Sequence, residues 1–271
     1  MNKINNTKGF TLVEMLIAAT ISVIVISSAL GVYLIQHKHL LVQDQISDMQ
    51  QNIRASMQEL STKIRMAGYN VPVGIIPLYA FNTNPDTIEI IYDSDLLGGV
   101  QIEHDMPQPS AELRCDGHDL TPLHDGDWVF IYDPNEQEGE FFEITQVQYA
   151  SGHIQHNTMS LDKAYPAGSK ILKLNKIKYY VDNTTDPQHP RLVVKYVGQS
   201  PQIYADNITD LQFRYLLSSG VVVDVPSLVN MVREVMIDIT ARTDKPDDEF
   251  VNQYRIRGLQ TSVKVRNLAI N

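Results

Sequence analysis

Near its N-terminus the chain reads Lys8-Gly9-Phe10-Thr11-Leu12-Val13-Glu14 and then continues as an apolar segment from Met15 to Ile35. A helix needs about 20 consecutive apolar residues to span a bilayer, and this segment has that length. Glu14 lies at the edge of the segment, where a carboxylate is costly in lipid unless it finds a partner. The pattern predicts a membrane-spanning helix in which Glu14 has a functional role.

The residues from Gly9 to Glu14 resemble the prepilin signal of type IV pilins and type II secretion pseudopilins. This resemblance implies that the prepilin peptidase cuts between Gly9 and Phe10 and methylates the new amino group of Phe10. It also implies that Glu14 pairs with the N-terminal amine of a neighbouring subunit during assembly. Residues 1–9 are then a leader peptide that is removed. The alternative is an ordinary signal-anchor helix that happens to contain a glutamate.

The distribution of charge predicts the topology. The chain has 271 residues and a net charge of −10, and Lys3 and Lys8 lie in the leader with no acidic residue. Positive residues favour the cytoplasmic side, so the N-terminus is expected in the cytoplasm and the domain beyond Ile35 in the periplasm. Without the leader, 20 basic residues face 32 acidic ones. Such an acidic surface does not attract nucleic acid, and no nucleic-acid partner is expected.

Cysteine usage excludes a disulfide framework. Cys115 is the one cysteine of the chain. The exported domain must therefore be held together by its hydrophobic core and not by disulfides. Many major pilins close a C-terminal loop with a disulfide, which this chain cannot form. The absence of this disulfide is weak evidence against a major pilin subunit.

The predicted helix continues beyond the membrane, because no proline or glycine occurs between Gln36 and Gly68. Apolar residues recur there at spacings of three and four, which is typical of one face of an amphipathic helix: Ile46, Met49, Ile53, Met57, Leu60 and Ile64. Gly68 and Pro72 predict its end. Gly31 is either a point of local melting or a small residue for close helix packing.

Beyond Pro72 the chain predicts strands separated by turn residues. The candidates are Thr87–Tyr92, Trp128–Tyr132, Glu140–Tyr149, Lys170–Val181, Arg191–Tyr196, Ile208–Leu217, Val232–Arg242 and Leu259–Arg266. Short turns at Ser151-Gly152 and Ser218-Ser219-Gly220 favour antiparallel pairing. The predicted fold is α+β, with a long N-terminal helix packed on a mainly antiparallel, pilin-like β domain. Its parts are a transmembrane and assembly half (10–36), an amphipathic half (37–68) and a periplasmic domain (69–271).

Internal motifs narrow the resemblance to PilW-type minor pilins. The end of the helix, with Arg54-Ala55-Ser56, Glu59-Leu60 and Ile64-Arg65-Met66-Ala67-Gly68-Tyr69, is similar to theirs. So are the runs 125–133, 142–145, 208–215, 235–242 and 265–268, in the same order along the chain. Each of these motifs also has a simpler reading as part of a core strand or of the last helical turn. The J-type pseudopilins of type II secretion share the leader and the helix end, and they are the second interpretation.

No catalytic, cofactor or metal site is predicted. Cys115 with His118 could form a nucleophile and base, but a lone pair of this kind in a loop is more simply incidental. The acidic loop 133–140 lacks the ligand spacing of an EF-hand, so a solvated turn is favoured over calcium binding. The basic residues near the C-terminus suggest DNA capture only weakly: Arg255, Arg257, Lys264 and Arg266.

The expected function is that of a minor type IV pilin, a non-enzymatic protein that helps to start assembly in a priming or tip complex. The alternatives are a J-like minor pseudopilin of a secretion system and, more distantly, a pilin-like DNA-uptake protein. The expected partners are other minor pilins, the major pilin, the prepilin peptidase, the inner-membrane assembly platform and membrane lipid. The chain is expected first in the inner membrane, with a single pass, and then in the filament at the cell surface.

Overall fold

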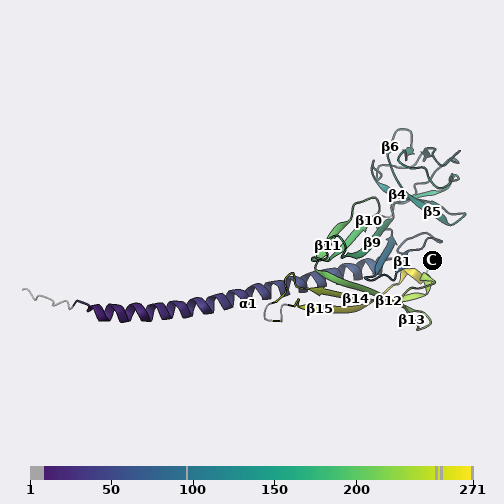
Figure 1. Cartoon of the computed structure of the whole chain (residues 1–271). Helices are drawn as coiled ribbons and strands as arrows, with labels where there is room; N and C mark the ends of the chain where they lie inside the picture. Colours follow the sequence, from purple (N-terminus) through teal and green to yellow (C-terminus); the bar gives the residue numbers. More distant parts are fainter. Residues whose placement is uncertain (1–8, 96, 248–249, 251–252, 270–271) are drawn as a thin grey trace, which may run out of the picture.

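The computed structural model describes residues 9–95, 97–247, 250 and 253–269. The predicted leader residues 1–8, with Lys3 and Lys8, lie outside the described part. The chain forms a long helix whose N-terminal half extends away from a β-rich domain and whose C-terminal half packs on it (Figure 1). This arrangement confirms the predicted α+β fold.

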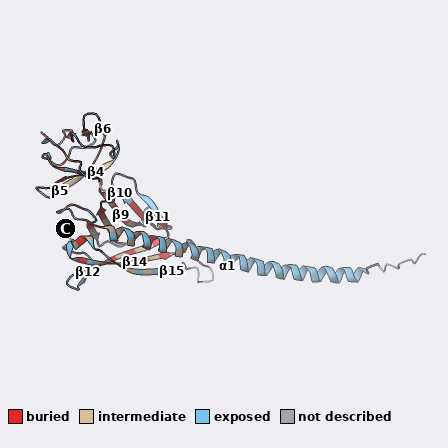
Figure 2. Cartoon of the chain, turned by 180° about the vertical axis from the view of Figure 1, so that it is seen from behind, coloured by how far each residue is buried: buried red, intermediate tan, exposed pale blue. Residues whose placement is uncertain are grey.

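The helix α1 runs without interruption from Leu12 to Met66. Its buried residues include five of the six predicted apolar positions, while the sixth, Ile46, is partly buried against the same core. The helix ends where predicted: Ala67 is the C-cap, and Gly68 adopts a φ of +79°. Periodicity alone therefore identified the face that packs on the domain. Figure 2 shows that burial begins at the end of α1 that meets the β-rich domain.

Two antiparallel sheets enclose the buried half of α1. The five-stranded sheet has the order β1 (Leu78–Phe81), β2 (Thr87–Tyr92), β9 (Asn175–Asp182), β10 (Arg191–Tyr196) and β11 (Gln202–Asp206). The four-stranded sheet has the order β13 (Val222–Val223), β12 (Ile208–Leu217), β14 (Val232–Arg242) and β15 (Ile256–Lys264). Side chains from both sheets and from the helix form one hydrophobic core. Two 3-10 turns complete this part, η1 (Val229–Met231) and η3 (Asn267–Ala269).

A second lobe is inserted between β2 and β9. It contains two three-stranded sheets with β3 (Leu113–Arg114), β4 (Trp128–Asp133), β5 (Glu138–Glu143), β6 (Gln146–Gln148), β7 (His153–Gln155) and β8 (Lys170–Leu172). The lobe has its own core, while β2 and β9 pair directly below it, with Tyr92 opposite Asn175. Residues 94–174 carry fourteen carboxylates and four Lys or Arg residues, so the net charge of the whole chain resides in this lobe. The sequence did not predict this insertion.

A small set of contacts holds the lobe on the domain. Phe130 and Tyr132 of β4 pack with Val71 and Ile91 in a separate apolar cluster. The hydroxyl of Tyr132 donates a 2.8 Å hydrogen bond to the carbonyl of Val73. These contacts join the root of the lobe to the segment that follows α1.

The predicted strands are confirmed in position, with two corrections. Thr87–Tyr92, Arg191–Tyr196, Ile208–Leu217 and Val232–Arg242 have the predicted bounds, and both predicted turns join paired strands. Glu140–Tyr149 was wrong as one strand because it divides into β5 and β6, which belong to different sheets. Lys170–Val181 was also wrong as one strand: it divides into β8 in the lobe and β9 in the main sheet. The short or exposed strands β1, β3 and β11 were missed.

Candidate assembly site at the N-terminal helix

Glu14 lies in the first turn of α1 and forms a capping box with Thr11. Its Oε2 atom accepts hydrogen bonds from the Thr11 N–H at 2.8 Å and from the Thr11 hydroxyl at 2.9 Å. The Glu14 N–H in turn donates to Oγ1 of Thr11 over 3.3 Å. These bonds satisfy N–H groups that the start of a helix otherwise leaves unpaired. The carboxylate is therefore held at the helix start, beside Phe10, by a residue of its own chain.

The predicted processing residues are accessible. Gly9 and Phe10 precede the helix, and the Phe10 side chain is 86 % exposed. A Cβ placed on Gly9 meets no atom of the described residues within 4 Å, apart from its own chain neighbours. The backbone at the predicted cleavage position is thus open to another protein.

The helix that follows is suited to lipid. By length and composition α1 can cross a membrane, and its most apolar 18-residue window has a mean hydropathy of 2.3 with none of it buried. Three of its hydroxyls bond within the helix: Thr20 donates to the Ile17 carbonyl, while Ser22 and Ser28 donate to carbonyls four residues earlier, each at 2.8 Å. Such internal bonding lowers the cost of a hydroxyl in lipid. These three hydroxyls were not predicted from the sequence.

The helix continues through Gly31 without a break, and apart from the nearby backbone of α1 no described atom lies within 4 Å of a Cβ placed there. The isolated chain thus contains no local melting at this position. The open space around Gly31 leaves room for another helix to approach closely.

The helix-end motif has identifiable structural roles. Ser56 is buried and its hydroxyl donates to the Asn52 carbonyl over 2.7 Å. Glu59 accepts a hydrogen bond from Tyr179, and Gly68 N–H donates to the Ile91 carbonyl over 2.9 Å. The motif therefore docks the end of α1 on the first sheet.

Cys115 and His118 do not form a nucleophile and base. The Cys115 side chain is fully buried, and burial raises the pKa of its thiol to about 12. The Nε2 atom of His118 instead lies 2.6 Å from Oε1 of Glu103. A buried neutral thiol is a poor nucleophile.

The acidic loop 133–140 is organised around a lysine. The Lys163 ammonium lies 3.2 Å from Oδ2 of Asp133 and 2.6 Å from Oε1 of Glu138, and it also binds Glu136. Within the described residues, no group of three or more His, Cys, Asp or Glu side chains is arranged to hold a metal ion. The Lys163 ammonium therefore occupies the position in this loop for which a calcium ion was considered.

The basic residues near the C-terminus do not form one free patch. Arg255 binds Oδ2 of Asp247 through Nε at 3.0 Å and Nη2 at 2.7 Å. Lys264 lies 3.8 Å from Oε1 of Glu234. Two of the four cations thus already face carboxylates, which weakens the DNA-capture interpretation.

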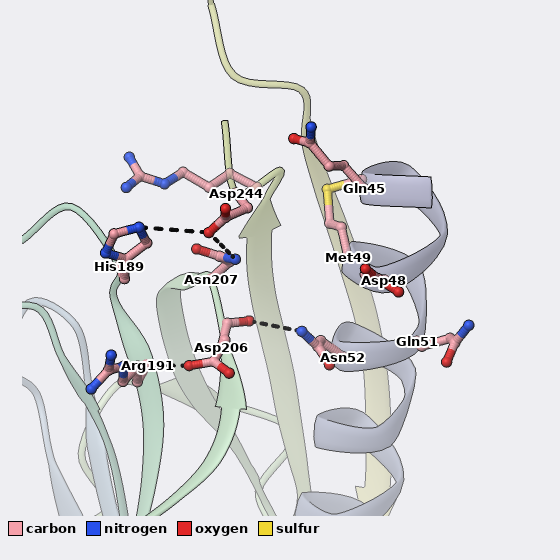
Figure 3. A pocket seen from close by; sticks show the side chains of 11 residues that line it. Gln45, Asp48, Met49, Gln51, Asn52, His189, Arg191, Asp206, Asn207 and Asp244 are labelled. Atoms are coloured by element: carbon pink, nitrogen blue, oxygen red, sulfur yellow. Dashed lines mark hydrogen bonds and ion pairs between the residues drawn. The ribbon is translucent and has the colours of Figure 1, made fainter. Parts of the chain in front are cut away.

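A polar cavity of about 580 Å³ lies where α1 enters the domain (Figure 3). The polar groups that line it contact one another. Asn52 donates to the Asp206 carbonyl over 3.2 Å, and Arg191 Nε lies 3.3 Å from Oδ1 of Asp206. His189 lies 3.6 Å from Asp244 across the upper rim. The cavity contains both signs of charge, and the Asn52 hydrogen bond ties the helix to the edge strand β11 of the first sheet.

Comparisons with known proteins bear on the N-terminus. Residues 4–30 match the family model described as the prokaryotic N-terminal methylation motif. No curated protein and no solved structure matches the chain. The matched residues contain Gly9, Phe10 and Glu14, and they support a type IV pilin or pseudopilin-like protein. The motif implies processing by the prepilin peptidase and assembly with other pilins.

Proposed function

We propose that the chain is a minor pilin of a type IV pilus that helps to start assembly in a priming or tip complex. The observation that carries this proposal is the methylation motif on a helix whose apolar half remains exposed before α1 enters the β domain. An exposed apolar half of this length needs lipid or other helices around it. A subunit that moves from the membrane into a helix bundle meets this requirement in both places.

Processing by the prepilin peptidase is proposed between Gly9 and Phe10, with methylation of Phe10. The leader, residues 1–9, is then removed. Glu14 becomes the fifth residue of the mature chain, and its carboxylate is proposed to pair with the N-terminal amine of a neighbouring subunit. The capping box supports this role because it holds the carboxylate at the helix start while the chain is alone in lipid.

The proposed topology is a single pass through the inner membrane, with the N-terminus in the cytoplasm and the β domain in the periplasm. The proposed partners are other minor pilins, the major pilin and the inner-membrane assembly platform. No catalytic role or cofactor is part of the proposal. The buried Cys115 thiol and the structural roles of the helix-end motif agree with an assembly protein.

Features beyond the N-terminus favour a minor over a major subunit. The chain lacks a disulfide, since Cys115 is its one cysteine, and it carries a large acidic lobe on the β domain. The PilW-type motifs at the helix end also favour a minor subunit. A J-like minor pseudopilin of type II secretion is the second candidate, because that class shares both the leader and the helix end. The genes next to this one distinguish the two, since pilus and secretion systems have different companion proteins.

Replacing Gly9 with valine tests the processing step. The side chain has space in the free chain, so the expected loss of cleavage reflects the peptidase and not misfolding. The mature N-terminus is measured by mass spectrometry, which also detects the methyl group on Phe10. A mature, methylated chain in the Gly9→Val variant would remove the peptidase assignment.

Two substitutions at Glu14 test the assembly role. Glu14→Ala removes both the charge and the cap, whereas Glu14→Gln keeps an oxygen that accepts from Thr11. Both variants should be made, processed and retained in the membrane, yet recovered in sheared filaments at severalfold lower levels. Normal recovery of Glu14→Gln would show that the charge has no part in assembly.

A further inference from the structure

Strand β15 forms one edge of the four-stranded sheet, and no described strand pairs with its outer side. It pairs with β14 over nine residues, from Ile256 to Lys264, without a register shift. An edge of this length presents a row of backbone N–H and C=O groups to which another strand can bind. Proteins often shorten or bulge such edges, and this one is neither short nor bulged.

Two hydrogen bonds show which backbone groups point outward. The Val265 N–H donates to the Arg233 carbonyl over 3.0 Å, and the Thr243 N–H donates to the Arg255 carbonyl over 2.9 Å. Bonded and non-bonded pairs alternate in an antiparallel ladder, so the odd-numbered residues of β15 bond to β14. The even-numbered residues direct their N–H and C=O groups to the open side: Ile256, Gly258, Gln260, Ser262 and Lys264. No backbone group of the other described residues forms a hydrogen bond with these N–H and C=O groups.

The side chains leave this edge accessible. All five even-numbered residues of β15 are exposed. The Ser262 hydroxyl donates to Oε2 of Glu234 over 3.2 Å, which directs that side chain toward the neighbouring strand and away from the open edge. On the opposite face Val263 is buried in the core that α1 covers. The helix therefore covers a face of β15 and leaves its edge open.

We propose that the open edge of β15 binds an extended segment of a different subunit, which adds a fifth strand to this sheet. The inference rests on the proposed function, because the assembled filament supplies the partner. Main-chain hydrogen bonds along an edge are a general means of binding an extended segment. Five outward-facing residues offer five N–H and five C=O groups for this purpose.

A second copy of the chain is a poor occupant. The strand β15 lies lengthwise along α1 (Figure 1). Antiparallel pairing of two β15 strands about a two-fold axis would point their helices in opposite directions. Two chains anchored in the same membrane cannot adopt that arrangement, so β15 of a second copy is not the occupant.

The charges of β15 specify the partner further. The central residues from Gly258 to Val263 carry no charge, whereas Arg257 and Lys264 lie near the two ends of the strand. Arg257 is exposed and forms no ion pair with the described residues. Opposite charges that face each other across a strand pair stabilise it. The bound segment should therefore have an uncharged centre and an acidic residue that faces Arg257.

Hydrogen exchange of the full-length chain tests the edge directly. Backbone exchange is measured at single-residue resolution for the chain in detergent and for the tagged chain in sheared filaments. In detergent the odd-numbered amides of β15 should exchange slowly and the even-numbered ones quickly. In filaments the even-numbered amides should slow by at least about tenfold. Fast exchange at these positions in filaments that contain the chain would overturn the proposal.

A matched pair of variants tests the consequence for assembly. Ser262→Pro removes one outward N–H but none that bonds to β14, whereas Ser262→Ala keeps it and loses the same hydroxyl. The proline variant should reach the membrane at the wild-type level and enter filaments about tenfold less, since one blocked position interrupts the added strand. Equal incorporation of the two variants would overturn the inference. Absence of the wild-type chain from filaments would instead overturn the proposed function, and this inference with it.

Discussion

The hydroxyl of Tyr179 donates a 2.6 Å hydrogen bond to Oε1 of Glu59, joining the centre of the first sheet to the buried half of α1. Tyr179 is fully buried, and burial, together with the Glu59 carboxylate, raises the pKa of its hydroxyl. Four residues further along the helix, the Lys63 ammonium donates to the Tyr92 hydroxyl over 3.0 Å. The helix is therefore fixed on this sheet by polar bonds as well as by its apolar face.

Tyr179→Phe should lower the free energy of unfolding by about 1.5 kcal/mol, because it removes a hydrogen bond to a charged group. Tyr204→Phe is the matched control. Its hydroxyl contacts the same helix at Ala55, but over 3.4 Å and at an exposed position, so its loss should cost under about 0.5 kcal/mol. Denaturant unfolding of the full chain in detergent measures both. Equal effects would show that the Glu59 bond contributes nothing specific.

Gly68→Ala should destabilise the chain by about 1–2 kcal/mol, because a side chain is strained at a φ of +79°. The new Cβ would also lie 3.1 Å from the Asn267 carbonyl oxygen. Gly31→Ala serves as the control, since it places a methyl group in open space within α1. This control should retain full stability, and thermal unfolding of both variants gives the comparison. A stable Gly68→Ala variant would contradict the assigned role of the glycine.

Asp86 should make stability depend on pH. Its side chain is 4 % exposed, and burial raises the pKa of its carboxyl although the Phe213 N–H donates to Oδ2 at 2.8 Å. Among the described residues, Oδ1 of Asp86 and the buried Tyr215 hydroxyl have no hydrogen-bond partner. A carboxyl whose pKa is raised on folding contributes most stability at low pH, and that contribution is lost as the pH rises through the folded pKa.

Asp86→Asn should therefore be more stable than the wild type at pH 7, with a difference that shrinks toward pH 4. The asparagine oxygen can still accept from Phe213 and adds no charge to the core. Unfolding free energies measured across this pH range give the result. A difference that stays constant with pH would exclude ionisation of Asp86 as its cause.

Lys163→Met should cost about 3 kcal/mol at neutral pH, because Asp133, at 2 % side-chain exposure, loses its cation. Burial raises the pKa of Asp133, but hydrogen bonds from the Asn135 N–H and from Lys163 outweigh it and hold the pKa below its ordinary value. The stability from a lowered pKa is present at neutral pH and lost in acid, so the effect of the substitution should fade as the pH falls.

Lys173→Met is the control for this prediction. Lys173 lies 3.0 Å from Asp127, but both side chains are about a quarter to a third exposed, at 30 % and 25 %. Such a pair contributes up to about 1 kcal/mol. Chemical unfolding at several pH values compares the two lysines. Similar losses of unfolding free energy for both variants at all pH values would mean that the burial of Asp133 does not determine how much its ion pair contributes to stability.

The lobe should be removable. Joining Ser94 to Leu174 by a two-residue turn leaves Tyr92 and Asn175 paired and the main core intact. The shortened chain should still fold cooperatively, with some loss of stability because Val71 and Ile91 lose their cover from Phe130 and Tyr132. Circular dichroism and retention in the membrane check this outcome. Failure to fold would show that the lobe belongs to the main folding unit.

How far the sequence predicts this molecule depends on the kind of contact. The buried face of α1 and the long central strands follow from local periodicity, because each element presents one side to a core. The break at Lys173-Leu174 carries no such signal: Ile171 and Ile177 are both buried apolar residues, but they belong to different cores. Only the tertiary pairing of β2 with β9 separates the lobe from the domain.

At the candidate site the sequence indicates which residues to propose, but not their local partners. Gly9, Phe10 and Glu14 stand out because charge and glycine are unusual beside an apolar run. The role of Thr11 as the cap for Glu14 depends on where the helix begins, which hydropathy alone does not fix. The outward-facing groups of β15 were equally hidden, because they depend on register and not on residue type.

The unbroken course of α1 has a mechanical consequence. A pull on its N-terminal end is carried along one continuous rod to the core that extends from Met49 to Ala67. Strand β15 lies lengthwise beside this rod, so the load acts in shear along the seam between helix and sheets. Many contacts along this seam then resist the force at the same time, whereas a force that peels strands apart breaks their hydrogen bonds one by one. The anchor and the fold thus form a single tension-bearing element.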